Sequence, residues 1–183
     1  LVVALVAATA SVVLAVPAGL ALARYEFPGR AAVHGLLLSP LIVPHLVLGV
    51  AILRLFALLG ARGSVAWLVA AHALVVLPYA LRLVLAGLAG MDRHVEQAAQ
   101  SLGAGRWTVF RRITLPLMLP GLTGGWLLAF INSFDEVTMS LFITSPQTVT
   151  LPVRMYTLAI ESIDPTLAAV SALLVGLTAL VMV

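Results

Sequence analysis

The chain has 183 residues, of which 62% are hydrophobic and 9% are charged, and its mean hydropathy is +1.16. Soluble domains carry about 25% charged residues, so this composition excludes a water-soluble globule and a disordered chain. The absence of cysteine excludes disulfides and cysteine-based metal sites. The formal charge of +3 comes from ten arginines and seven acids. A nucleic-acid-binding function is disfavoured because these arginines form no basic stripe on a soluble surface.

Five apolar runs are each long enough to cross a bilayer, which takes about 20 residues. In chain order, the predicted crossings are residues 1–23, 31–53, 65–90, 115–134 and 165–183. Pro40 and Pro44 in the second run and Pro78 in the third are expected to bend their helices. We therefore predict an all-α polytopic membrane protein. The chain starts at Leu1 and ends inside an apolar run, so we expect a segment truncated at both ends.

The arginines predict which ends of the crossings face the cytoplasm. Residues 24–30 and 91–114 lie on one side of a five-crossing bundle and hold six arginines, whereas the other side holds Arg62 and Arg154. Arginine accumulates on the cytoplasmic side, so both basic segments are predicted to be cytoplasmic. Segment 135–165 has four acids and one arginine, and we place it outside.

The long polar loop at residues 91–116 has the pattern of two short helices. Apolar residues recur at helical spacing from residue 95 to residue 102, which forms one stripe. Asp92 is placed as an N-cap and Gly103 as the left-handed residue that ends the first helix. Such a helix can dock a partner protein. It can equally lie in the lipid headgroup layer, with Arg111 and Arg112 on phosphates.

The same loop resembles the EAA motif of ABC importer permeases, in which Glu-Ala-Ala is followed by Gly and then by Ile-x-Leu-Pro. Here the matching residues are Gln97-Ala98-Ala99, then Gly103, then Ile113-Thr114-Leu115-Pro116, with the intervals of the family motif. Gln97 replaces the leading glutamate of the family, and Glu96 stands one residue earlier. The carboxylate's role would fall to Glu96, or the ATPase contact would use an amide.

The resemblance extends over essentially the whole chain. Residues 19–45 are similar to the family's first cytoplasmic turn and next helix, and residues 133–171 are similar to PotC-like polyamine permeases, the spermidine/putrescine type. This implies a single transmembrane domain over residues 1–183, with the five-helix MetI-like (type I) permease core and a cytoplasmic coupling helix pair.

The resemblance also implies partners and a location. It implies a multi-pass permease of the bacterial cytoplasmic (inner) membrane, working with a second permease subunit, two ATPase subunits and an external solute-binding protein. ATP and Mg²⁺ would bind the ATPase subunits, so no cofactor is expected on this chain, and no Walker motif occurs in it. The implied ATPase-coupling residues are Glu96, Gln97, Ala98, Ala99, Leu102, Gly103, Ile113, Leu115 and Pro116.

A substrate pathway is suggested at the outer end of the fourth crossing. Asp135 and Glu136 follow that run directly, where carboxylates could offset the lost hydration of a polyammonium solute. Phe134, Tyr156 and Tyr79 are candidate aromatic faces for its cations. The alternative is that both acids are simply solvated at a helix end.

Other polar residues within the apolar runs have simpler interpretations. Arg54 and Arg82 can extend to the interface, or Arg82 can pair with a carboxylate inside the bundle. The histidines at 34, 45 and 72 lack the spacing of a metal site, so satisfied interior or interfacial side chains are expected. Gly121 and Gly125 form a GxxxG pair, which indicates close helix packing.

Three functions follow from these features. The first is an ABC importer permease for a small cationic solute, a polyamine such as spermidine or putrescine, with ferric iron, an aminophosphonate or another organic ion as alternatives. The second is a membrane scaffold whose loop recruits a partner other than an ATPase. The third, an intramembrane enzyme, lacks paired catalytic residues in the crossings, so we expect no enzymatic activity in this chain.

Overall fold

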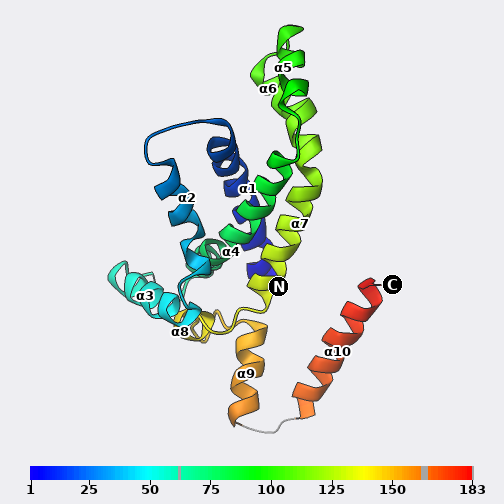
Figure 1. Ribbon diagram of the computed structural model, residues 1–183. Helices are drawn as coiled ribbons and strands as arrows, with labels where there is room; N and C mark the ends of the chain where they lie inside the picture. The colour runs from blue at the N-terminus through cyan, green and yellow to red at the C-terminus, as the bar shows by residue number, and fades with distance from the viewer. Residues whose placement is uncertain (62, 162–164, 183) are drawn as a thin grey trace.

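The computed structural model describes the backbone of residues 1–61, 63–161 and 165–182, and the side chains of all of these except 177–179, 181 and 182. The described residues are helical, without strands, as the sequence predicts (Figure 1). The helical segments are α1 (Val2–Arg24), α2 (Arg30–Leu38), η1 (Ser39–Leu41), α3 (His45–Leu58), α4 (Val65–Ala89), α5 (Arg93–Ser101), α6 (Arg106–Val109), η2 (Phe110–Thr114), α7 (Leu115–Phe134), α8 (Ser140–Ile143), α9 (Leu151–Glu161) and α10 (Pro165–Met182).

The core of the molecule is the packing of α1, α4 and α7 against one another. The buried face of α1 consists mostly of small residues, which let neighbouring backbones approach closely. They are Ala4, Ala7, Ala8, Ser11, Ala15 and Gly19. The hydroxyl of Ser11 donates to the carbonyl of Ala73 on α4 at 3.0 Å, so a hydrogen bond also joins two of the core helices.

The GxxxG pair on α7 is part of the same packing. A Cβ at Gly121 would lie 2.8 Å from the carbonyl oxygen of Leu83 on α4, and one at Gly125 would lie 3.3 Å from the Cα of Ala80. Side chains at these two positions would therefore push α4 and α7 apart. The predicted role in close helix packing is confirmed.

The second predicted crossing, residues 31–53, is not one straight helix. The segments Arg30–Leu41 and His45–Leu58 are bent by 103° relative to each other, and α3 projects to the side of the bundle with α8 beside it (Figure 1). Pro40 lies in the 3₁₀ turn and Pro44 is the N-cap of α3. Proline has no N–H and restricts the residue before it, so two prolines this close end one helix and start another.

The fourth predicted crossing starts earlier than expected. We placed its beginning near Leu115, but one helical path runs over Arg106–Phe134. The path contains the π-helical segment η2 directly before Pro116. There the N–H of Leu115 donates to the carbonyl of Phe110, five residues back. The wider turn accommodates a proline that cannot donate to the ordinary i−4 carbonyl and whose ring would collide with it.

The described residues contain three helices long and apolar enough to cross a membrane, or four if the bent pair counts as one crossing. The three are Val2–Arg24, Val65–Ala89 and Arg106–Phe134. The last predicted crossing forms α10. Its apolar stretch with described side chains, Pro165–Gly176, is shorter than a crossing. The predicted number of five is thus not confirmed. Arg62 and Asp164, which entered the charge balance above, lie outside the described residues.

Candidate functional site

The predicted coupling loop, residues 91–116, projects from one end of the bundle as two short helices, α5 and α6 (Figure 1). Asp92 caps α5, because its Oδ1 accepts a hydrogen bond from the backbone N–H of His94 at 2.9 Å. This bond from a backbone amide, with a second from the His94 ring, lowers the pKa of the Asp92 carboxyl. Gly103 ends the helix with φ of +88°, a conformation that glycine adopts readily. Both predicted ends of the first loop helix are confirmed.

Glu96 ties this loop to the bundle. Its Oε1 accepts a hydrogen bond from Nη2 of Arg24 at 3.0 Å and another from the Thr114 hydroxyl at 2.6 Å. The side chains of Arg24 and Glu96 are each only 15% exposed. One carboxylate therefore joins three elements: the end of α1, the loop helix α5 and the π-helical turn. The ion pair also shows that the two basic segments predicted to share a side lie at the same end of the bundle.

Gln97, in contrast, faces away from the bundle. Its side chain is exposed, like that of Ala98, and it makes no hydrogen bond to the part of the chain described. Leu102 is 89% exposed and Trp107 is 70% exposed. Large apolar side chains this accessible at a polar tip indicate a surface that either a partner protein or the membrane covers.

The remaining motif residues mark the passage from the loop into α7. Ala99, Ile113 and Leu115 are half-buried and Pro116 is exposed. Val95 and Ala98 belong to the exposed side of α5, whereas Ala99 turns toward the bundle. The predicted apolar stripe is therefore divided between the surface of the loop and its base.

The acidic pair at the other end of α7 has two different environments. Glu136 is 6% exposed, its Oε2 lies 2.6 Å from Nδ1 of His45, and its Oε1 accepts a hydrogen bond from the N–H of Met139. Glu136 is thus a buried anchor between α3 and the segment after α7, and it is not solvated. Asp135 is exposed.

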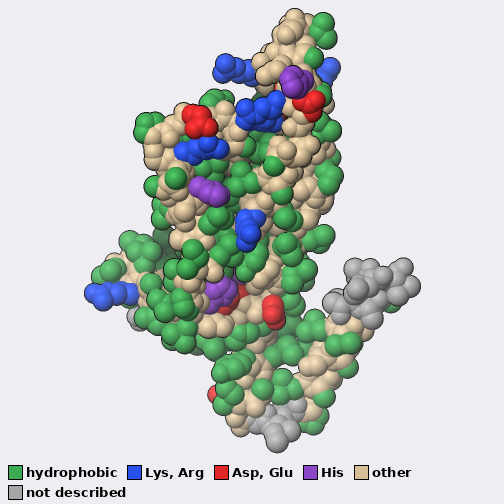
Figure 2. All heavy atoms as spheres, viewed as in Figure 1, with side chains coloured by type: hydrophobic (Ala, Val, Ile, Leu, Met, Phe, Trp, Pro, Cys, Tyr) green, Lys and Arg blue, Asp and Glu red, His purple; other side chains and the backbone are tan. Residues whose placement is uncertain are grey.

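A small cavity lies beside these residues, with a volume of about 270 Å³. Its lining consists of His45, Ile131, Asn132, Asp135, Glu136, Val137 and Thr138. The amide nitrogen of Asn132 donates to the carbonyl of Leu128, which leaves the amide oxygen able to accept. The cavity therefore combines the exposed Asp135 carboxylate with a neutral acceptor. Acidic side chains are visible at this lower end of the bundle in Figure 2.

The predicted aromatic residues are not gathered at this cavity. Phe134 stacks on Phe130, which stacks on Trp126, with ring centroids 6.0 and 5.5 Å apart. Tyr79 packs with Trp126 and Phe130 against the core between the helices. Tyr156 is exposed on α9 and does not line the cavity. Phe134 thus belongs to an aromatic ladder along α7, Tyr79 packs against the same buried cluster as two rings of that ladder, and Tyr156 is exposed on another helix.

The polar partners of the acidic segment were missed from the sequence. His72 is 1% exposed, and its ring nitrogens lie 2.9 Å from the Ser133 hydroxyl and 3.0 Å from the Ser140 hydroxyl. It holds both sides of the segment that carries Asp135. A histidine in an apolar run was the only signal for it. Its two bonds agree with the expectation of a satisfied interior histidine.

Two further observations concern polar residues of the apolar runs. Arg82 is exposed on α4, and within the described residues it has no carboxylate partner, so the predicted pair inside the bundle is not found. In the same residues no group of three acidic or histidine side chains could hold a metal.

An all-helical membrane bundle with an exposed helical loop at one end and an acidic cavity at the other is the architecture of a multi-pass inner-membrane transport component. The chain belongs to the family described as "Binding-protein-dependent transport system inner membrane component", whose model matches residues 15–183. It is 34% identical over 96% of its length to the spermidine/putrescine transport system permease protein PotC of Haemophilus influenzae, covering 68% of that protein.

Two further relatives have related names. The chain is 36% identical over 89% of its length to PotC of Escherichia coli K12, covering 61% of that protein. It is 39% identical over 75% of its length to the molybdenum transport system permease protein ModB of the same organism, covering 67%. The chain thus spans about two thirds of the length of these relatives.

Proposed function

We propose that this chain is a permease subunit of an ATP-driven ABC importer and that it translocates a small polyamine, such as spermidine or putrescine, delivered by an external binding protein. The observation that carries the proposal is the continuous helical path Arg106–Phe134. It begins in the coupling loop, passes the Glu96 contact at Thr114 and ends beside Asp135. At about 1.5 Å per residue it extends about 43 Å, so one element links the two ends.

A cationic substrate suits the outer end of this path. The exposed Asp135 carboxylate is not neutralised by any ion pair within the described chain, whereas Glu136 is already held by His45. An ammonium group can pair with Asp135 and donate to the Asn132 amide oxygen. The aromatic faces of Phe134 and Phe130 continue from there along α7, and such faces attract cations. The names of the PotC relatives support the same solute class.

The loop at the other end suits an ATPase. The exposed surface of α5 and α6, with Val95, Leu102 and Trp107, would contact a separate ATP-hydrolysing subunit. Glu96 would then transmit displacement of α5 to α1 through Arg24 and to α7 through Thr114. The second permease subunit, two ATPase subunits and the external binding protein complete the proposed assembly.

Uptake measurements test the substrate. The full-length gene is deleted and restored on a plasmid, and uptake of radiolabelled putrescine, spermidine and molybdate is followed. We expect polyamine uptake to be lost in the deletion strain and to remain poor with Asp135→Asn, while Glu161→Gln, an exposed acid on α9, restores it. Loss of molybdate uptake with intact polyamine uptake would show that the solute resembles that of ModB.

Cross-linking tests the partner. The chain has no cysteine, so a single Leu102→Cys substitution provides one thiol at the tip of the loop. We expect a bifunctional thiol reagent to link it to the ATPase subunit in membranes. Leu58→Cys, which is 77% exposed on α3, is the control and should give no such product. Cross-linking of Leu102→Cys to a protein without ATPase activity would support the scaffold function instead.

A further inference from the structure

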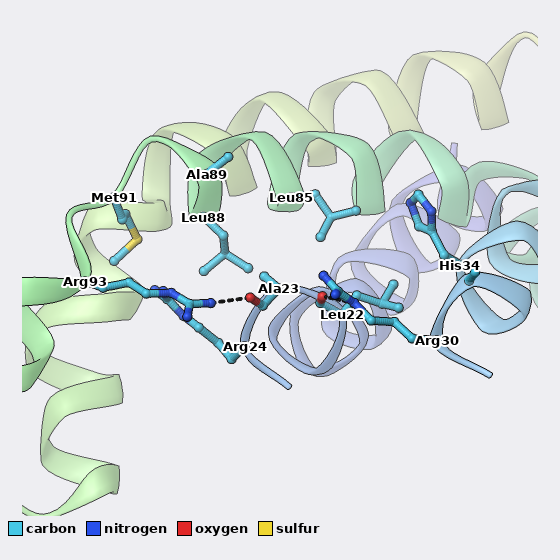
Figure 3. Close-up of a pocket in the computed structure, with 11 residues that line it drawn as sticks. Leu22, Ala23, Arg24, Arg30, His34, Leu85, Leu88, Ala89, Met91 and Arg93 are labelled. Carbon is cyan, nitrogen blue, oxygen red and sulfur yellow. Dashed lines mark hydrogen bonds between the residues drawn. The ribbon is translucent and has the colours of Figure 1, made fainter. Parts of the chain in front are cut away.

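A large cavity in the described residues lies at the end of the bundle that carries the coupling loop, away from the acidic cavity. It has a volume of about 710 Å³ and lies where the end of α1, the start of α2, the end of α4 and the start of α5 meet (Figure 3). Its lining consists of Leu22, Ala23, Arg24, Arg30, Ala31, His34, Leu85, Leu88, Ala89, Met91 and Arg93.

The polar part of this lining is entirely basic. Arg24, Arg30, Arg93 and His34 line the cavity, and no acidic side chain does. Figure 3 shows the three arginines reaching it from different elements of the chain. The remaining lining residues are apolar, so the cavity has a basic rim over an apolar floor.

The charges of the arginines are only partly balanced. Arg24 pairs with Glu96, and Arg30 pairs with Glu26, a side chain that is 90% exposed. Arg93 has no carboxylate partner among the described residues, since the neighbouring acid at position 92 bonds to His94 instead. The cavity therefore keeps a net positive charge.

Two of these guanidinium groups are also held in place. Arg30 donates through Nε to the carbonyl of Leu22 at 2.8 Å, and Arg93 donates through Nη2 to the carbonyl of Ala23. Both carbonyls belong to the last turn of α1. An arginine has more N–H donors than these bonds use, so each guanidinium is oriented and still has donors available.

We propose that this cavity binds the headgroup of an anionic phospholipid. The lipid phosphate would accept hydrogen bonds from Arg93 and Arg30, a pairing that guanidinium groups favour. An acyl chain would lie against Leu85 and Leu88 on α4. Basic pockets between membrane helices on the cytoplasmic side are suited to such headgroups, and the arginine distribution predicts that this end is cytoplasmic. The site does not depend on the identity of the transported solute.

Native mass spectrometry of the purified full-length importer complex tests the site. The complex is titrated with phosphatidylglycerol or phosphatidylcholine, and the bound lipid is counted. Near a membrane surface each arginine strengthens anionic-lipid binding by about fivefold. We therefore expect Arg93→Gln and Arg30→Gln each to weaken phosphatidylglycerol binding by about fivefold, with little change for phosphatidylcholine. Arg154→Gln is the matched control, because this exposed arginine on α9 lies outside the cavity, and it should bind as the unaltered complex does.

A second variant covers the case in which an arginine substitution prevents assembly by uncapping α1. Leu85→Trp would fill the apolar floor and leave every arginine in place, and it should also weaken phosphatidylglycerol binding. The proposal is overturned if Arg154→Gln weakens binding as much as Arg93→Gln, or if Arg93→Gln and Leu85→Trp both bind normally. It is also overturned if inorganic phosphate displaces the lipid completely, because the site would then hold a free anion.

Discussion

Replacing Glu96 by alanine should release the loop helix α5 from the bundle. The substitution removes the hydrogen bonds from Arg24 at 3.0 Å and from Thr114 at 2.6 Å. Hydrogen bonds to charged groups contribute about 1.5–3 kcal/mol to stability. Exposed ion pairs contribute only about 0–1 kcal/mol, but both ionic partners here are only 15% exposed, so we expect the larger contribution. Alanine is a good helix former, so α5 itself should remain intact.

Hydrogen exchange on the purified full-length permease measures this release. If α5 opens locally, its amides should exchange about 10–150-fold faster in Glu96→Ala, the rate ratio that corresponds to about 1.5–3 kcal/mol. Gln97→Ala is the matched control, since this neighbouring side chain is exposed and makes no hydrogen bond to the described chain. Unchanged α5 exchange in Glu96→Ala, or an equal increase in Gln97→Ala, would refute the assignment of Glu96 as the tether.

Two other predictions concern packing and pH. Gly121→Ala should lower the free energy of unfolding of the permease by roughly 1–2 kcal/mol and lower its melting temperature. The reason is that overpacking against a backbone carbonyl at 2.8 Å outweighs the gain in helix propensity. Gly35→Ala, which meets nothing within 4 Å, should instead be neutral or stabilising by up to about 1 kcal/mol, and equal thermal shifts would contradict the packing argument. The bond from the His94 backbone N–H keeps the folded-state pKa of Asp92 below the ordinary 3.8, so its capping of α5 is complete above that pH and is lost as the pH falls through the lowered value. Exchange of the first α5 amides, corrected for intrinsic rates, should therefore rise below about pH 3.8 in the unaltered protein and stay constant in Asp92→Asn, which retains a capping side chain.

Features set by local sequence were predicted well. The apolar runs at residues 1–23 and 65–90 became α1 and α4, and the capping residues Asp92 and Gly103 lie at the two ends of the loop helix. The GxxxG pair lies at a close helix contact. Each of these depends on hydrophobic length, on a capping bond within a few residues, or on side-chain size.

Features that join distant parts of the chain were decided by the tertiary structure. Arg24 and Glu96 are 72 residues apart, and His45 and Glu136 are 91 residues apart. Nothing in the spacing of these residues indicates that they meet, because an ion pair across a bundle depends on how the helices pack. The start of the fourth crossing was misplaced for a related reason. Pro116 normally marks a first turn, and only the contacts around the π-helical segment show that the helix continues through it.

The sequence by itself thus determined that the chain is an all-helical membrane protein and where the loop at residues 91–116 forms a helix, because these follow from hydrophobicity and local backbone chemistry. Only the tertiary structure decided which acid is a tether, which is a buried anchor and which remains exposed. The difference arises because the role of a charged side chain depends on its burial and its partners, and both are set by helix packing.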